Sequence, residues 1–179
     1  MAMRESLQGT DVFLIGMMGA GKTSVGQALA RQLHYRFFDT DVLVSRSAGK
    51  SIPQIFADEG EAGFRDWEMR VLQELAAETR SAIATGGGIV LRRQNWGYLQ
   101  QGVVVWLDAP VELIAERLAG DTTRPLLQAP NPVERLASLL EERRPLYQQA
   151  DLRVAIEPDC SPDGIATQAI ERMASVLKP

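Results

Sequence analysis

A segment of eight residues, GMMGAGKT from Gly16 to Thr23, matches the phosphate-binding pattern G-x-x-x-x-G-K-[ST]. Gly16, Gly19 and Gly21 can take backbone angles that are closed to other residues, so successive N–H groups can turn inward toward an anion. The N-terminus of a following helix adds roughly half a positive charge. We expect Lys22 to reach the terminal phosphates of a nucleoside triphosphate and Thr23 to bind Mg²⁺. The pattern does not say what receives the phosphate.

Two aspartates, Asp39 and Asp41, end a short apolar segment with the sequence FFDTD. If this segment is extended, residues two apart project to the same side, so both carboxylates would face the same way. Two carboxylates opposite a nucleotide phosphate can hold Mg²⁺ through water or accept a hydrogen bond from a hydroxyl acceptor. The alternative is that Asp41 only caps a helix. The spacing leaves both interpretations open.

A charged cluster and a glycine run provide two further candidates. Arg65 and Glu68 are three residues apart in a predicted helix and share a face, and Glu61 lies four residues before Arg65. On spacing alone, a solvated ladder of ion pairs is the favoured interpretation of these three residues. The glycines at 86–88 follow a predicted strand, where they either let a ligand approach the backbone closely or form a tight turn.

Arginines in the second half of the chain could contact anions. Arg124 lies in the polar, proline-rich segment 120–132, which is predicted to be a mobile loop able to close over a transferring phosphate. Arg143 and Arg144 lie in EERRPLY, and one of them could grip a carboxylate with two hydrogen bonds. For each arginine the alternative is a surface charge.

Strands and helices must position these residues. We predict strands at 12–15, in YRFFDTD, in SAIAT, in GVVVWLDAP and at 152–156. Helices are predicted after the phosphate-binding loop, from about Asp41 to Gly49, and from a capping box at Ser51 to Gly60. Further helices are predicted at 61–79, 91–100, 111–119, 133–150 and 165–177.

This alternation predicts an α/β fold with a parallel sheet that helices cover on both faces. In such sheets ligands bind at the carboxyl ends of the strands. The glycine-rich and aspartate segments described above each follow a predicted strand. We therefore expect them to meet at one edge of the sheet.

Composition narrows the class of protein. The chain has 179 residues, 45% of them apolar and 23% charged, which is typical of one globular domain. The net charge of −4 argues against a broad nucleic-acid or anionic-membrane surface. Cys160 and His34 are the only residues of their types, so an internal disulfide or a multi-histidine metal site is excluded. Without a signal-peptide pattern or a long apolar run, we expect a cytosolic protein, and a monomer.

Taken together, the segments GMMGAGKT, FFDTD, SIPQIFADEGEAGFRDWE, TGGGIV, TTRPLL and RRPLY resemble shikimate kinase, in that family's order and spacing. The resemblance covers about residues 11–177. It implies a three-layer P-loop fold of the nucleoside-monophosphate-kinase type, with a five-stranded parallel sheet and a mobile lid. Residues 1–10 would be a flexible tail and 11–179 a single kinase domain. Within that domain, the substrate segment would be about 41–70 and the lid about 119–132.

The resemblance also implies an activity: transfer of phosphate from ATP to the 3-hydroxyl of shikimate, with Mg²⁺, on the pathway to chorismate and aromatic amino acids. Lys22, Asp39 and Arg124 would be catalytic, with Thr23 and, through water, Asp39 at the metal. ATP would be bound by Gly19, Ala20, Gly21, Lys22, Thr23, Ser24, Arg117 and Arg124. Shikimate would be bound by Asp41, Arg65, Glu68, Gly86, Gly87, Gly88 and Arg143, with Ile52, Phe56 and Phe64 as an apolar wall.

Within this pattern, Arg65 and Arg143 would take the carboxylate of shikimate, and Asp41 and the Gly87 N–H its hydroxyls. Glu68 would orient the arginines, and Arg117 would stack on adenine. Whether Asp39 accepts the hydroxyl proton or only orients the hydroxyl stays open.

Two segments depart from the family pattern. EPDCSPDG lacks a basic residue that some relatives place beside adenine, so adenine contacts near residues 160–162 are not carried over. VVVWLD looks like a Walker B strand, but we assign no catalytic role to Asp108. The alternatives are another small-molecule kinase of the same fold, such as a gluconate or nucleoside-monophosphate kinase, or a nucleotide-binding protein without chemistry.

Overall fold

The structure is a computed structural model that describes residue 7, residues 9–121, residue 128 and residues 130–177. The predicted tail and lid fall partly outside these residues, and Arg124 falls outside them. The division into tail, domain, substrate segment and lid therefore stays a prediction. Leu7 is buried and the Gly9 carbonyl accepts a hydrogen bond from the Arg80 N–H, so these two residues pack against the rest of the domain.

Five parallel strands form one sheet in the order β2-β3-β1-β4-β5, which confirms the predicted fold class. The strands β1 and β4 are apolar and buried almost throughout, as expected where helices cover both faces. In the edge strand β5 buried and exposed residues alternate. The strands are β1 (Val12–Ile15), β2 (Arg36–Asp39), β3 (Ser81–Ala84), β4 (Val103–Asp108) and β5 (Leu152–Ala155).

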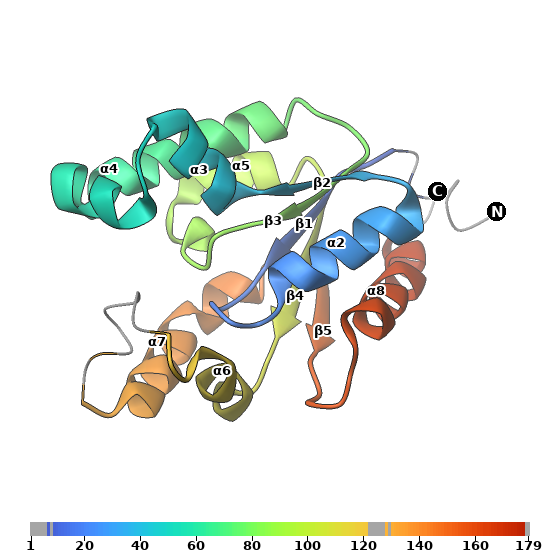
Figure 1. Cartoon of the computed structure of the whole chain (residues 1–179). Helices are drawn as coiled ribbons and strands as arrows, with labels where there is room; N and C mark the ends of the chain where they lie inside the picture. Colours follow the sequence, from blue (N-terminus) through green and yellow to red (C-terminus); the bar gives the residue numbers. More distant parts are fainter. Residues whose placement is uncertain (1–6, 8, 122–127, 129, 178–179) are drawn as a thin grey trace.

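Helices cover the two faces of this sheet, giving three layers (Figure 1). The helices α2 and α8 pack against each other on one face, and α4, α5 and α7 lie on the other. The helices are α2 (Lys22–Leu33), α3 (Thr40–Ala48), α4 (Ile52–Leu75), α5 (Arg93–Leu99), α6 (Val111–Leu118), α7 (Pro132–Tyr147) and α8 (Pro162–Val176), with a 3₁₀ turn at Ile89–Leu91. Within the described residues, no helix has the length and apolar character that a membrane crossing requires.

The capping box predicted for the start of α4 is confirmed, whereas the predicted break and end of this helix are corrected. The capping box at Ser51 is present: its hydroxyl accepts from the Gln54 N–H, and the Gln54 side chain accepts from the Ser51 N–H. At Gly60 the backbone leaves helical geometry (φ 69°, ψ −175°), but the helix resumes at once, so the predicted break is a kink inside α4. The helix ends at Leu75 rather than at 79, because the chain goes on in turn-like hydrogen bonds.

A further correction concerns FFDTD. Its last two residues are helical, so Asp39 and Asp41 do not project from one extended strand. The reason is that Asp39 caps α3: its Oδ1 accepts from the N–H groups of Asp41 and Val42, at 2.9 and 3.4 Å. The cap is therefore Asp39, and Asp41 lies in the first turn of the helix.

Candidate active site

The phosphate-binding loop joins the carboxyl end of β1, the middle strand, to α2. Gly16, Gly19 and Gly21 have φ values of 144°, 75° and 97°, so the predicted glycine conformations are confirmed. A Cβ at Gly16 would lie 2.6 Å from the Leu107 carbonyl oxygen of the neighbouring strand. The loop thus needs glycine here both for its backbone angle and for its close packing.

The lysine of the loop is folded back onto its own backbone. Lys22 is 9% exposed, and its Nζ donates to the carbonyls of Gly16 and Met17, both at 2.7 Å. The ammonium group therefore lies within the curve of the loop. Gly21, the N-cap of α2, gives no side-chain cap, so the first-turn N–H groups lack such a partner.

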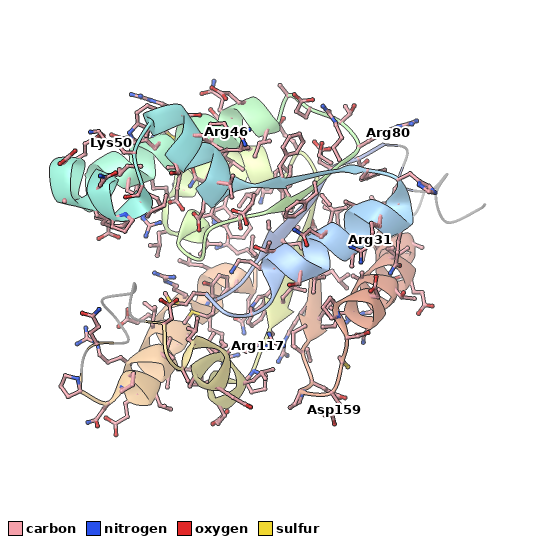
Figure 2. All side chains as sticks on the ribbon, in the orientation of Figure 1. Arg31, Arg46, Lys50, Arg80, Arg117 and Asp159 are labelled. Atoms are coloured by element: carbon pink, nitrogen blue, oxygen red, sulfur yellow. The ribbon has the colours of Figure 1, made fainter. Side chains whose placement is uncertain are left out.

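Arg117, near the end of α6, lies against the same loop (Figure 2). Arg117 Nη1 donates to the Gly19 carbonyl at 3.0 Å, and a Cβ at Gly21 would lie 3.3 Å from this nitrogen. Of the other predicted nucleotide-binding residues, Ala20 lies between the two glycines and is buried, and Ser24 lies in the first turn of α2 and is exposed.

Two oxygen-bearing side chains meet beside the loop. The Thr23 hydroxyl donates to Asp39 Oδ2 at 2.8 Å, while Asp39 Oδ1 caps α3. Asp39 thereby ties the first turn of α2 to the first turn of α3. A hydroxyl and a carboxylate side by side next to a phosphate loop are ligands of the kind that Mg²⁺ takes, together with water and phosphate oxygens. The residues therefore fit the expected cation.

The glycine run after β3 is surrounded by charged side chains. A Cβ at Gly86 would lie 2.7 Å from Glu68 Oε1 and 2.9 Å from Asp41 Oδ1, and a Cβ at Gly88 would lie within 2.5 Å of the Arg65 guanidinium. The absence of side chains at these positions lets the charged groups reach the backbone. Close packing of these side chains against the backbone accounts for Gly86 and Gly88, and the approach of a ligand to the run stays a prediction.

Arg65 and Glu68 form a buried pair and not a solvated ladder. Arg65 Nη1 lies 2.5 Å from Glu68 Oε2, with the Glu68 side chain fully buried and that of Arg65 12% exposed. Only Glu61, 3.3 Å from Arg65 Nη2, extends into solvent. The favoured expectation from spacing was wrong because α4 turns this face toward residues 86–88.

Burial raises the pKa of Glu68, and the neighbouring Asp41 charge acts in the same direction, whereas the Arg65 guanidinium lowers it. Among the described residues, Glu68 Oε1, Arg65 Nε and Arg143 Nε are buried without a hydrogen-bond partner. Buried polar atoms are rarely left unpaired in folded proteins. Three such atoms around one glycine run therefore indicate a site for a polar ligand.

Arg143 reaches the same run from α7, and a Cβ at Gly87 would lie 3.5 Å from its Nη1. The neighbouring Arg144 instead pairs with Glu141 at 2.9 Å. Of the two arginines in EERRPLY, the structure therefore brings Arg143 to the site.

The predicted apolar wall lies in the amino-terminal half of α4. Phe56 and Phe64 pack with ring centroids 4.6 Å apart, and Arg65 lies over the Phe64 ring at 5.2 Å. Phe64 is buried, Ile52 is half-buried and Phe56 is 40% exposed. An exposed phenylalanine beside charged groups is suited to contacting the apolar part of a small ligand.

Other candidates stay apart from this site. Asp108 pairs with Arg153 on the edge strand, with Nη2 at 2.5 Å. Cys160 is exposed in the connection between β5 and α8. No cluster of three or more metal-binding side chains occurs among the residues that the structure describes.

Two residues at the site were missed by the sequence analysis. The Thr40 hydroxyl accepts from the Gly86 N–H at 2.9 Å, and the Tyr147 hydroxyl donates to the Gly87 carbonyl at 2.8 Å. Thr40 lies between the two predicted aspartates, and Tyr147 lies four residues after Arg143 on the same helix face. Those spacings were the available signal.

Residues 18–174 match the sequence family described as shikimate kinase. The chain belongs to the shikimate kinase family. It is 56% identical over 177 residues to the shikimate kinase of Nostoc punctiforme, covering 99% of this chain and 98% of the relative. Identity to the shikimate kinase of Synechococcus elongatus is 51% over 178 residues, or 99% of this chain and 94% of that one.

Solved structures of the family agree with this fold. The shikimate kinase of Acinetobacter baumannii in complex with shikimate superimposes with a TM-score of 0.90 at 39% identity, covering 97% of each chain. A gluconokinase of Sinorhizobium meliloti gives a TM-score of 0.56 at 20% identity, covering 94% of this chain and 95% of that one. The gluconokinase shares the fold alone, whereas the shikimate kinases share fold and sequence across the chain.

Proposed function

We propose that this protein transfers the γ-phosphate of ATP to the 3-hydroxyl of shikimate. The observation that carries the proposal is that Gly87, in the glycine run after β3, lies against the phosphate-binding loop. A Cβ at Gly87 would lie 3.4 Å from the Met18 N, 3.6 Å from the Gly16 carbonyl oxygen and 3.5 Å from Arg143 Nη1. A phosphate donor and an anionic acceptor bound on either side of this contact would lie end to end.

ATP is bound by the backbone of residues 19–24, and Lys22 leaves the carbonyls of Gly16 and Met17 for the phosphates. Because Lys22 is buried on the loop, its ammonium group already lies close to the proposed phosphate site. Arg117, already held on Gly19, takes the adenine side, in line with its predicted stacking role. Thr23 and, through water, Asp39 would hold Mg²⁺, which would supply positive charge to neutralise the phosphates.

Shikimate is held by its carboxylate between Arg65 and Arg143, whose unpaired buried Nε atoms are available as donors. Asp41 and the Gly87 N–H bind ring hydroxyls, and Glu68 fixes Arg65. Ile52, Phe56 and Phe64 cover the ring. Gly86 and Gly88 keep the backbone open for these side chains.

Phosphoryl transfer needs positioning and charge neutralisation more than covalent help. Asp39, whose two oxygens are held by Thr23 and by the α3 cap, has a fixed direction and orients the acceptor hydroxyl. Lys22 neutralises charge on the transferring group. Arg124, which lies outside the described residues, is proposed to assist it from a lid that closes to exclude water.

A coupled assay of ADP release tests the activity, with and without shikimate as the acceptor. We expect ADP release to depend on shikimate, and a parallel panel of gluconate and nucleoside monophosphates to give little stimulation. Stimulation by another acceptor in the panel, with none by shikimate, would overturn the proposal in favour of a related small-molecule kinase. ATP turnover that no acceptor stimulates would indicate a nucleotide-binding protein without this chemistry.

A further inference from the structure

Tyr147 is the last residue of α7, yet its side chain reaches the glycine run after β3. It is fully buried, and its ring stacks on that of Trp106 with centroids 5.7 Å apart and planes 21° apart. Its hydroxyl donates to the Gly87 carbonyl at 2.8 Å. The buried Tyr147 thus connects the end of α7 to the glycine run that follows β3.

The same hydroxyl also faces Arg143, one helical turn earlier. Burial raises the pKa of Tyr147, while the Arg143 charge and a hydrogen bond with its side chain act in the opposite direction. The hydroxyl donates its proton to the Gly87 carbonyl, and the positive charge of Arg143 acts on the same hydroxyl. The peptide that this hydroxyl holds is also the one beside Arg143, whose Nη1 would lie 3.5 Å from a Cβ at Gly87.

The contacts continue to the phosphate-binding loop. The Cβ that Gly87 lacks would touch Met18 N and the Gly16 carbonyl oxygen. Trp106, on which the Tyr147 ring stacks, also lies close to this loop, because a Cβ at Gly16 would be 3.6 Å from Trp106 Cδ1. Tyr147 thus contacts residues on both sides of the place where the phosphate-binding loop meets the glycine run after β3.

From these contacts we infer that Tyr147 is a positioning residue for phosphoryl transfer. Its hydroxyl sets the direction of the Gly87 peptide and of the Arg143 guanidinium, and through them the place of shikimate. This inference rests on the proposed function. It assigns the hydroxyl a task that differs from packing, because the ring alone fills the space against Trp106.

The variant Tyr147→Phe separates the two tasks, since it keeps the ring and removes the hydroxyl. We expect the KM for shikimate to rise about tenfold, equivalent to about 1.4 kcal/mol, with less than about a twofold change in the KM for ATP. The matched control is Tyr98→Phe, which removes the hydroxyl of a half-buried tyrosine on α5. That variant should leave both KM values unchanged.

A second readout does not depend on activity. The Gly87 carbonyl belongs to the same peptide group as the Gly88 N–H, so losing the hydrogen bond should shift the amide resonance of Gly88 in ¹⁵N-labelled protein. The melting temperatures of the variants show whether the fold is kept. A Tyr147→Leu variant, which also loses the ring, should melt lower than Tyr147→Phe.

The outcomes are distinct. A raised KM for shikimate together with a shifted Gly88 resonance would support the inference. An unchanged KM in Tyr147→Phe, while the wild type phosphorylates shikimate, would overturn it and leave the proposed function intact. An equal rise in both KM values would also overturn it, because it would indicate general loosening. A wild type that neither binds nor phosphorylates shikimate would instead refute the proposed function, and this role of Tyr147 with it.

Discussion

Replacing Gly88 by alanine tests the acceptor side of the site with a single methyl group. The backbone at Gly88 has φ −94° and ψ 8°, which alanine can adopt, so the backbone itself does not oppose the change. The added Cβ would lie 2.3 Å from Arg65 Nη1 and 2.4 Å from Nη2. Non-bonded heavy atoms pack at about 3.5–4.0 Å, so the guanidinium must move by about 1 Å or more.

Such a displacement exceeds the tolerance of a charged hydrogen bond, whose length varies by only a few tenths of an ångström. Arg65 can move because its guanidinium is the far end of a flexible side chain, so we expect the fold to persist. The carboxylate of shikimate then loses a charge-assisted contact, which is worth about 1.5–3 kcal/mol. The KM for shikimate should rise about ten- to hundredfold, and the KM for ATP should stay within about twofold.

The assay is steady-state kinetics with each substrate varied in turn, supported by thermal melting. The control is Gly97→Ala in α5, where an added Cβ meets nothing within 4 Å. Because alanine favours a helix over glycine by about 1 kcal/mol, this control should melt slightly higher with unchanged kinetics. An unchanged KM for shikimate in a folded Gly88→Ala protein would refute the placement of Arg65 in the site.

Three further substitutions test other parts of the site. Lys22→Ala should abolish turnover while circular dichroism and melting remain near wild type; turnover at the wild-type rate would contradict the nucleotide assignment. Arg143→Ala should weaken shikimate binding about ten- to hundredfold by calorimetric titration, with little effect on ATP, and an equal loss for both ligands would count against its role. Glu68→Gln tests the buried carboxyl by its pH dependence. Burial raises the pKa of Glu68 above its ordinary value of 4.5, so the folded state binds more protons than the unfolded state as pH rises through this range. The free energy of unfolding of the wild type therefore falls as the pH rises above about 4.5, and the melting temperature of Glu68→Gln relative to wild type should rise over the same change. A difference that stays constant with pH would show that Glu68 does not titrate in this way.

The parts of the site that sequence alone predicted are those determined by local backbone chemistry. The phosphate-binding loop needs glycine at Gly16, Gly19 and Gly21 because of their positive φ values, and such a need is readable from a pattern. The capping box at Ser51 is equally local. The parallel sheet covered by helices follows from the alternation of elements, whereas the order of its strands was not predicted and comes from the structure.

The parts that could not be read locally depend on contacts between distant segments. Whether Arg65 and Glu68 form a solvated ladder or a buried pair is decided by residues 86–88, about 20 positions away in the chain. The same contact decides whether those glycines serve close approach. Asp39 was expected to share an extended segment with Asp41, and its role as a helix cap became clear only once the start of α3 was known.

The kink at Gly60 has a consequence for how substrate preference can change. Ile52 and Phe56 lie before it, while Arg65 and Glu68 lie after it, in the part of α4 whose Val71 and Leu72 are in the core. In the proposed site, Ile52 and Phe56 before the kink and Phe64 after it cover the ring, whereas Arg65, which grips the acid group, lies only after it. We therefore expect that mutations in the part of α4 before Gly60 can change which ring fits, while Arg65 in the second part keeps its contact with the anion.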